Sequence, residues 1–420
     1  MIAINPLKTI ILNLSLETKN IFKILGPGIL VAATGVGAGD LIAAAVSGAQ
    51  YGYALLWAAV LGAILKYVLN EGISRYQLIS GESLLSGWKH RLHPFVSWYF
   101  IVYLFIWSLI VAGALMAACG LAAHAMIPEL SVIQWGLIHS VVALIIVGVG
   151  KYKVVEKLMR IFIALMFIVT ILSAILIQPD MMEIIKNIFI PRVPANSVKF
   201  ILGVIGGVGG SVTLLSYGYW IKEKQWSGKS YLKRSRIDLG IAYTLTAIFG
   251  ISIMIIAAGV KPEIMSGSQM VVGMADKLET VVGGFGRWIF LIGFWGAVFS
   301  SMIGVWQGIP YLFADFYSQY KPSSKFQGEY TASNAYKYFL VYLAIPPMLL
   351  LFASKPVWLV ILYAVSGSFF MPFLAFTLLI LNNKFKILKD ELNGKMTNGL
   401  LIISLLVFLY LLVVEVISKF

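Results

Sequence analysis

Long runs of apolar residues, separated by short polar segments, recur along the whole chain. Many of them exceed the roughly 20 residues that a helix needs to cross a bilayer core of about 30 Å. The runs do not alternate apolar and polar residues, so they do not fit barrel strands. A segment in hydrocarbon must satisfy its own backbone amides, which a helix does. The pattern predicts eleven transmembrane helices, near residues 24–48, 53–74, 96–126, 131–149, 158–178, 198–221, 239–259, 285–314, 335–353, 357–381 and 398–418.

Composition supports an integral membrane protein. Of 420 residues, 60% are apolar and 12% are charged, whereas a soluble domain carries about 25% charge. The predicted loops are short, so residues 1–420 are interpreted as one membrane domain. The single Cys119 excludes a disulfide framework or a cysteine-based metal cluster, and no cofactor is expected. The first 20 residues lack the features of a cleaved signal peptide.

The formal net charge of +14 is distributed unevenly between the predicted loops. The N-terminus and every second loop hold 23 of the 32 Lys and Arg residues, and Lys66 lies within the second span. The positive-inside rule then predicts a cytoplasmic N-terminus and an outside C-terminus. The basic residues lie in six separate segments, so a nucleic-acid partner is not expected. The composition indicates a protein of a prokaryotic plasma membrane. The sequence is also compatible with a monomeric protein.

Two of the predicted spans contain clusters of glycine. The first reads Gly35-Val36-Gly37-Ala38-Gly39-Asp40, and residues 203–210 of the sixth hold five glycines. Each glycine inside a helix costs about 1 kcal/mol relative to alanine, so the clusters indicate tight helix packing or unwound backbone. The two clusters lie in the first and sixth spans, and these spans begin two consecutive five-span units. Interrupted segments at matching places in two halves are typical of transporters with inverted repeats and a central binding site.

Asp40 is the only aspartate within a predicted span. A carboxylate there is costly, so we expect it to contact a substrate or an ion. The alternative for Asp40 is a structural ion pair with Lys66. The Lys66 side chain could instead extend toward the cytoplasmic interface. The role of Lys66 stays open.

Hydroxyl groups follow the second glycine cluster. Hydroxyl and carbonyl oxygens suit hard cations or an organic ammonium group, although Ser and Thr also bond to the preceding helical turn. The predicted substrate- or ion-binding residues are Asp40, Gly37, Gly39, Thr34, Gly210, Ser211, Thr213, Ser216 and Tyr217, with Asp40 and Thr213 as metal ligands.

A recognisable pattern starts at Gly26-Pro27-Gly28 and continues through Gly52-Tyr53 to Trp57. Shorter motifs follow at Gly150-Lys151-Tyr152-Lys153, Ile205-Gly206-Gly207, Arg236-Ile237-Asp238, Ser300-Ser301 and Met371-Pro372-Phe373. In these residues and their order the chain resembles the Nramp divalent-metal transporters. The resemblance implies an all-α LeuT-like fold with unwound first and sixth spans. Two inverted five-helix repeats would occupy about 22–178 and 198–381, and the eleventh span 398–418.

The sequence departs from that family at its metal-binding motifs. Residues 37–40 stand where the family has Asp-Pro-Gly-Asn, so Asp40 replaces a ligand Asn and Gly37 a ligand Asp. Residues 213–215 replace Met-Pro-His, which removes a thioether and a titratable imidazole. The acidic pair of the third span corresponds to Ile110 and Gly113, and a glutamine of the tenth span to a position near Ala364. These losses favour a hard cation and argue against the family's proton relay.

The function expected is transport of a cation, chiefly a divalent metal ion, by alternating access through the lipid bilayer. The alternative is a transporter of the same fold with another substrate class, such as an organic amine or an amino acid. A sensor would need an output domain. Residues 37–40, Gly-Ala-Gly-Asp, match a signature motif of intramembrane aspartyl proteases. Such an enzyme would need a second intramembrane aspartate, so no enzyme is predicted.

Overall fold

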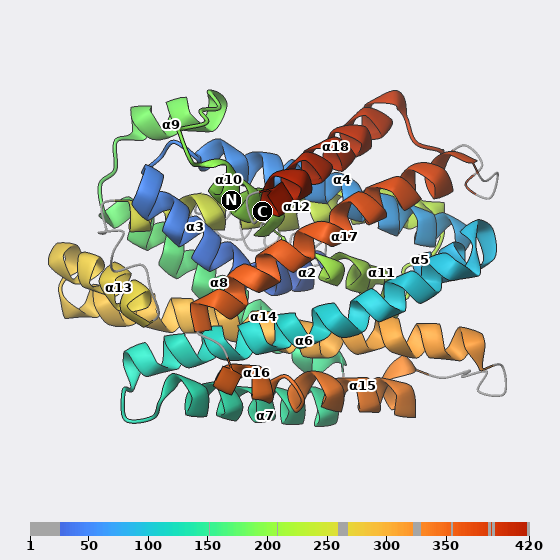
Figure 1. Cartoon of the computed structure of the whole chain (residues 1–420), viewed down its shortest axis with the longest axis horizontal. Helices are drawn as coiled ribbons and strands as arrows, with labels where there is room; N and C mark the ends of the chain where they lie inside the picture. Colours follow the sequence, from blue (N-terminus) through green and yellow to red (C-terminus); the bar gives the residue numbers. More distant parts are fainter. Residues whose placement is uncertain are drawn as a thin grey trace, which may run out of the picture.

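The computed structural model describes residues 26–150, 152–207, 209–258, 268–321, 329–353, 356–384, 388 and 391–417. All regular structure in these residues is helical, which confirms the predicted fold class. The long helices lie side by side with their axes roughly along the long dimension of the molecule (Figure 1).

The first half of the chain contains the helices of the first five predicted spans together with shorter elements outside them. They are α2 (Gly28–Gly35), α3 (Ala38–Tyr51), α4 (Leu56–Ser80), α5 (Leu84–Gly87), η1 (Trp88–Leu92), α6 (Pro94–Met126), α7 (Val132–Val149), α8 (Tyr152–Leu176) and α9 (Met181–Phe189). Local sequence explains several helix starts: Ser131 and Gln134 form a capping box at α7, and Asp180 caps α9 through two backbone N–H groups,.

The second half begins with another interrupted helix. Its elements are α10 (Val198–Gly207), η2 (Val212–Leu215), α11 (Ser216–Glu223), η3 (Lys229–Tyr231), α12 (Leu232–Ala257), α13 (Ser268–Val282), α14 (Gly284–Tyr320), η6 (Tyr330–Ala332), α15 (Asn334–Ala344), α16 (Met348–Ala353), α17 (Pro356–Lys384) and α18 (Lys395–Ile417). The ninth predicted span is divided into α15 and α16 around Pro346 and Pro347, because proline cannot donate a backbone hydrogen bond within a helix.

Nine helices of the described part are long and apolar enough to cross a membrane, and the bent pair α2–α3 brings the number to ten. The 29-residue α17 covers the remaining predicted span. Outward-facing side chains on the peripheral helices are apolar, including Ile145 on α7 and Ile168 on α8. Such surfaces suit contact with lipid.

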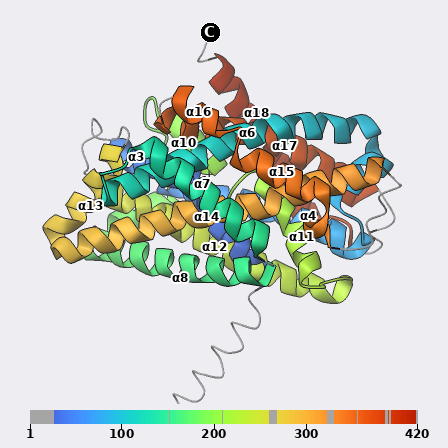
Figure 2. The same cartoon turned by 90° about the horizontal axis from the view of Figure 1, so that it is seen from below.

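The broken helices lie inside the bundle. Helix α14 packs against α2, α6, α7 and α8, while α3 and α10 pack against each other and against α17. Figure 2 shows α8 and α16 on opposite sides, with α14 between them. The residues of both breaks are therefore screened from the lipid-facing surface.

One helix begins earlier than the sequence pattern predicts. Helix α12 starts at Leu232 rather than near residue 239, so Asp238 lies within a helix and is fully buried. Asp238 was expected at a span end, and its burial is possible because two backbone N–H groups bond its carboxylate, as described below.

Candidate functional site

The first break separates α2 from α3. Helix α2 ends at Gly35, Val36 and Gly37 are non-helical, and the axes of the two helices differ by 52°. Gly37 is extended, and its Cα faces Ser301 of α14 so closely that a Cβ would collide with the Ser301 hydroxyl. A glycine there lets α14 approach the unwound segment, which confirms the predicted interruption.

The second break follows α10. Gly209 and Gly210 have φ angles of +77° and +79°, in the left-handed region that favours glycine,. The chain then forms the short η2 before α11 begins at Ser216. Two successive left-handed residues end the α10 hydrogen-bond ladder, so this prediction is also confirmed.

The two breaks touch each other. A Cβ on Gly35 would lie 2.7 Å from the Cα of Gly209, so the backbones are in direct contact. Asp40, in the first turn of α3, accepts a 3.1 Å hydrogen bond from Gly209 N at its Oδ2 atom. Its Oδ1 atom accepts no hydrogen bond from the described residues and lies beside Gly207. The structure therefore places the one predicted acidic ligand between both breaks.

The position of Asp40 also suits its charge. The side chain is only 5% exposed, and burial of an unpaired carboxylate is unfavourable. The N-terminal end of α3 supplies a favourable dipole and Gly209 a hydrogen bond,. Among the described residues, these groups hold the carboxylate through Oδ2 and leave Oδ1 for a further partner.

The carbonyl groups freed by the first break are bonded by hydroxyls of α14. Ser301 donates a 2.7 Å hydrogen bond to Thr34 O. The Ser300 hydroxyl donates chiefly to Ala297 O of its own helix at 2.9 Å, and Ala33 O lies 3.4 Å away as a weaker second acceptor. Uncharged donors thus satisfy the C-terminal end of α2.

A lysine bonds the carbonyl groups freed by the second break. Lys66 of α4 is fully buried, and its Nζ atom donates to Gly206 O at 2.9 Å and also to Gly210 O. It does not extend to the cytoplasmic interface, and it forms no direct ion pair with Asp40 among the described residues. The sequence left this role open, and the signal available was a charged residue inside an apolar span.

The predicted hydroxyl ligands lie in different surroundings. The buried Thr34 hydroxyl faces Gly304, and the buried Ser216 hydroxyl faces Gly308; neither has a hydrogen-bond partner among the described residues. The Thr213 hydroxyl lies against Gly210, and Ser211 lies against Gly367 of α17. Gly39 packs against the ring of Tyr363, also of α17. The structure therefore gathers most of the predicted residues around the breaks.

Tyr217 is directed elsewhere. Its hydroxyl donates a 3.0 Å hydrogen bond to Asp238 and is 3.1 Å from the Ser235 hydroxyl. Asp238 in turn accepts 2.7 Å hydrogen bonds from Gly26 N and Gly28 N at the start of α2. The structure does not bring Tyr217 together with Asp40, and the clamp formed by Asp238 was not identified from the sequence.

Ion pairs reinforce the same end of the bundle. Glu71 of α4 accepts hydrogen bonds from Arg75 at 2.6 Å and from Arg236 of α12 at 2.9 Å. Glu156 of α8 accepts one of 2.7 Å from Lys224. These contacts link α4 with α12 and α8 with the segment after α11.

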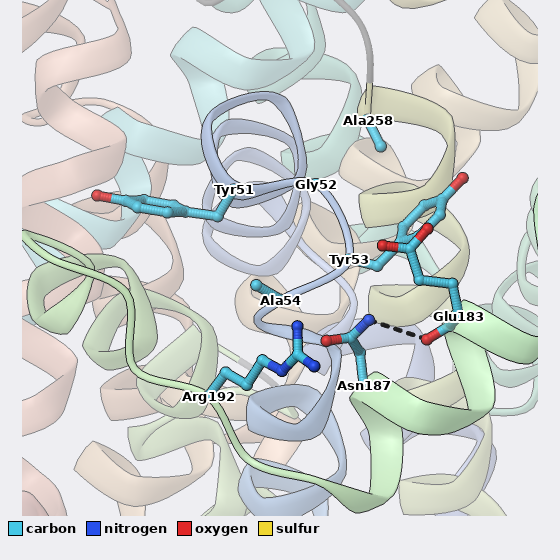
Figure 3. A pocket seen from close by; sticks show the side chains of 8 residues that line it. All are labelled: Tyr51, Gly52, Tyr53, Ala54, Glu183, Asn187, Arg192 and Ala258. Atoms are coloured by element: carbon cyan, nitrogen blue, oxygen red, sulfur yellow. Dashed lines mark hydrogen bonds between the residues drawn. The ribbon is translucent and has the colours of Figure 1, made fainter.

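A cavity of about 520 Å³ lies at the turn between α3 and α4. Figure 3 shows its lining, in which the Asn187 and Arg192 side chains point toward one another below Ala54 while Tyr51 points away. Tyr53 and Glu183 also line the cavity. The remaining lining residues are Gly52 and Ala258. None of the predicted ligands lines this cavity.

The sequence of the chain matches a protein family and individual proteins of that family. The family model described as natural resistance-associated macrophage protein-like, Nramp, matches residues 28–418. An uncharacterized protein of Pasteurella multocida is 26% identical over 64% of this chain and 63% of its own length. The divalent metal cation transporter MntH of Caldanaerobacter subterraneus is 22% identical over 69% of this chain and 70% of its own length. The match therefore spans less than two thirds of the first of these relatives.

A solved structure matches more completely. The manganese transporter of Eremococcus coleocola, in a mutant form, covers 94% of this chain and 86% of its own, with a TM-score of 0.76 and 16% identity. This likeness confirms the LeuT-like fold that the sequence resemblance implies.

Proposed function

This chain belongs to the Nramp family, and from that premise we propose that it carries a divalent metal cation across the membrane by alternating access. The observation that carries the proposal is Asp40, whose carboxylate lies between two unwound helices and whose Oδ1 accepts no hydrogen bond from the described residues. An anionic oxygen between two unwound helices is typical of a cation site in transporters of this architecture.

The remaining ligands would be uncharged oxygens. Thr34 offers a buried hydroxyl without a hydrogen-bond partner among the described residues, and Thr213 and Ser211 lie on the neighbouring segment. Hydroxyl and carboxylate ligands suit Mg²⁺, Ca²⁺ and Mn²⁺ better than softer metals. With a single carboxylate, we expect the cation to keep part of its hydration shell.

Contacts at one end of the bundle join the helices that surround the proposed site. The Asp238 clamp holds the start of α2, and the ion pairs of Glu71 and Glu156 join neighbouring helices at that end. Release of the cation there requires these contacts to separate. The proposed cycle alternates between this arrangement and one in which α2 has moved away from α12.

The test is metal flux into proteoliposomes. Wild type, Asp40→Asn and the control Glu129→Gln are compared with Mn²⁺, Mg²⁺ and Ca²⁺, together with a small panel of organic amines. Asp40→Asn removes the negative charge at nearly constant volume, and we expect it to abolish metal flux while the protein stays folded. Glu129 is exposed in the turn between α6 and α7, so its variant should transport normally.

Unchanged metal flux in Asp40→Asn would contradict the proposed site. Flux of an amine without any metal flux would contradict a metal substrate and favour the alternative, a transporter of organic amines or amino acids. The names of the relatives do not favour that alternative. The relatives so named are transporters, and we propose transport without a catalytic step.

We further propose a location in a prokaryotic plasma membrane with a cytoplasmic N-terminus, as the basic residues predict. The first residues and several basic positions of the loops lie outside the described residues. The proposal thus rests on the charge distribution in the sequence and is tested by the labelling experiment given in the Discussion. A monomer contains both breaks and Asp40, so the proposed mechanism needs no second copy.

A further inference from the structure

The break in α10 leaves two carbonyl groups without their helical donors. In a continuous helix Gly210 N would bond Gly206 O and Leu214 N would bond Gly210 O. Instead Gly210 N bonds Gly207 O, and Leu214 N bonds Ser211 O. Both freed carbonyls accept hydrogen bonds from the Lys66 ammonium.

Burial of that ammonium needs an explanation. The Lys66 side chain has no solvent exposure, and a buried charge is unfavourable unless its hydrogens are bonded. At the first break the freed carbonyl of Thr34 is bonded by a neutral hydroxyl, that of Ser301. A cation at the second break is therefore not required merely to satisfy carbonyl groups.

The surroundings of the Lys66 ammonium match those of a monovalent cation. Two main-chain carbonyls at the C-terminal end of a broken helix carry partial negative charge, and transporters of this architecture bind coupling ions at such ends. Asp40 on α3 attracts Lys66 electrostatically, although no ion pair joins the two among the described residues.

We propose that Lys66 is a tethered cation that permanently occupies the place of a monovalent ion at the α10 break. The ammonium bridges Gly206 and Gly210 and so keeps the two glycines after α10 in their unwound conformation. The inference deepens the proposed function: transport of the metal requires no free Na⁺ or K⁺ at this position. Lys66 acts through the backbone and is a positioning residue.

The proposal predicts chemical rescue. Lys66→Ala removes the ammonium and its stem and leaves the two carbonyls facing a cavity. Addition of propylammonium should raise the thermal unfolding temperature of this variant in a saturable manner, since a primary ammonium restores the N–H donors. Wild type should show no such rise. Tetramethylammonium, which has the charge but no N–H group, should not replace propylammonium.

Lys66→Met provides a matched variant that fills the space of the stem without the charge. We expect it to unfold at a lower temperature than wild type and to be insensitive to propylammonium. A Lys66→Met protein as stable as wild type would overturn the proposal, even if Lys66→Ala does not fold. The proposal would also be overturned if propylammonium did not raise the unfolding temperature of Lys66→Ala above its effect on wild type.

The readout separates this inference from the proposed function. Unfolding temperatures are measured without metal, so their outcome does not depend on whether metal flux is observed. In the flux assay, wild-type transport should be unchanged when Na⁺ and K⁺ are replaced by an impermeant organic cation. A loss of wild-type flux on this replacement would contradict the tethered-cation assignment.

Discussion

At the residue scale, Asp40 and Lys66 are charged side chains buried beside the two breaks. An aspartate inside an apolar span beside a glycine cluster is a strong local signal. The bonds from Lys66 to Gly206 and Gly210 join α4 to α10, far apart in sequence, and periodicity does not specify such a pair. Tyr217 was selected for its position after the break, but the rotation of α11 directs it to Asp238. Its binding role stays a prediction.

The conformation of Gly209 makes a prediction at the same scale. Gly209→Ala places a side chain at φ +77° and a Cβ 2.6 Å from Cε1 of Tyr243. A left-handed conformation costs a non-glycine residue about 1–2 kcal/mol, and the collision adds to this cost. We expect the free energy of unfolding in detergent to fall by about 2 kcal/mol or more, with loss of metal flux.

Gly148→Ala is the control for that variant. Gly148 lies within α7, and a Cβ there would meet no atom within 4 Å. Alanine is favoured over glycine in helices by about 1 kcal/mol, so this variant should be neutral or slightly more stable. If denaturant titrations give equal losses for both variants, the special conformation of Gly209 does not stabilise the fold.

At the element scale, the helices and both breaks were predictable because apolar length and glycine clustering are properties of one segment. Helix ends were less predictable. Helix α12 begins at Leu232, since Asp238 can be buried once Gly26 N and Gly28 N bond it. The burial of Asp238 depends on α2 lying beside α12. The sequence of either segment alone does not predict this contact. The division of the ninth span at Pro346 and Pro347 follows from local chemistry.

At the scale of the whole molecule, the LeuT-like fold was implied by family resemblance rather than by the helix pattern, which gives the number of spans but not their packing. The division into two repeats within one domain stays a prediction. The contact between Gly35 and Gly209 is the tertiary feature that unites the repeats at the proposed site. It requires two breaks at matching depths, as the glycine clusters indicated.

The orientation of the molecule can be tested with single cysteines. Cys119 is buried and should not react in the folded protein. Glu129→Cys and Lys229→Cys place thiols on loops predicted to lie outside and inside. In intact cells a membrane-impermeant maleimide should label only the Glu129→Cys protein. Labelling of Lys229→Cys alone would reverse the proposed orientation.

The central claim is that the cation binds between the two breaks with Asp40 as a ligand. Anomalous diffraction from crystals soaked with Mn²⁺ tests it most directly. We predict one strong peak between α3 and the segment after α10, about 2.0–2.6 Å from a carboxylate oxygen of Asp40, and its loss in Asp40→Asn crystals. A Mn²⁺ peak elsewhere that leaves Asp40 uncoordinated, or one that persists in the variant, would contradict the account.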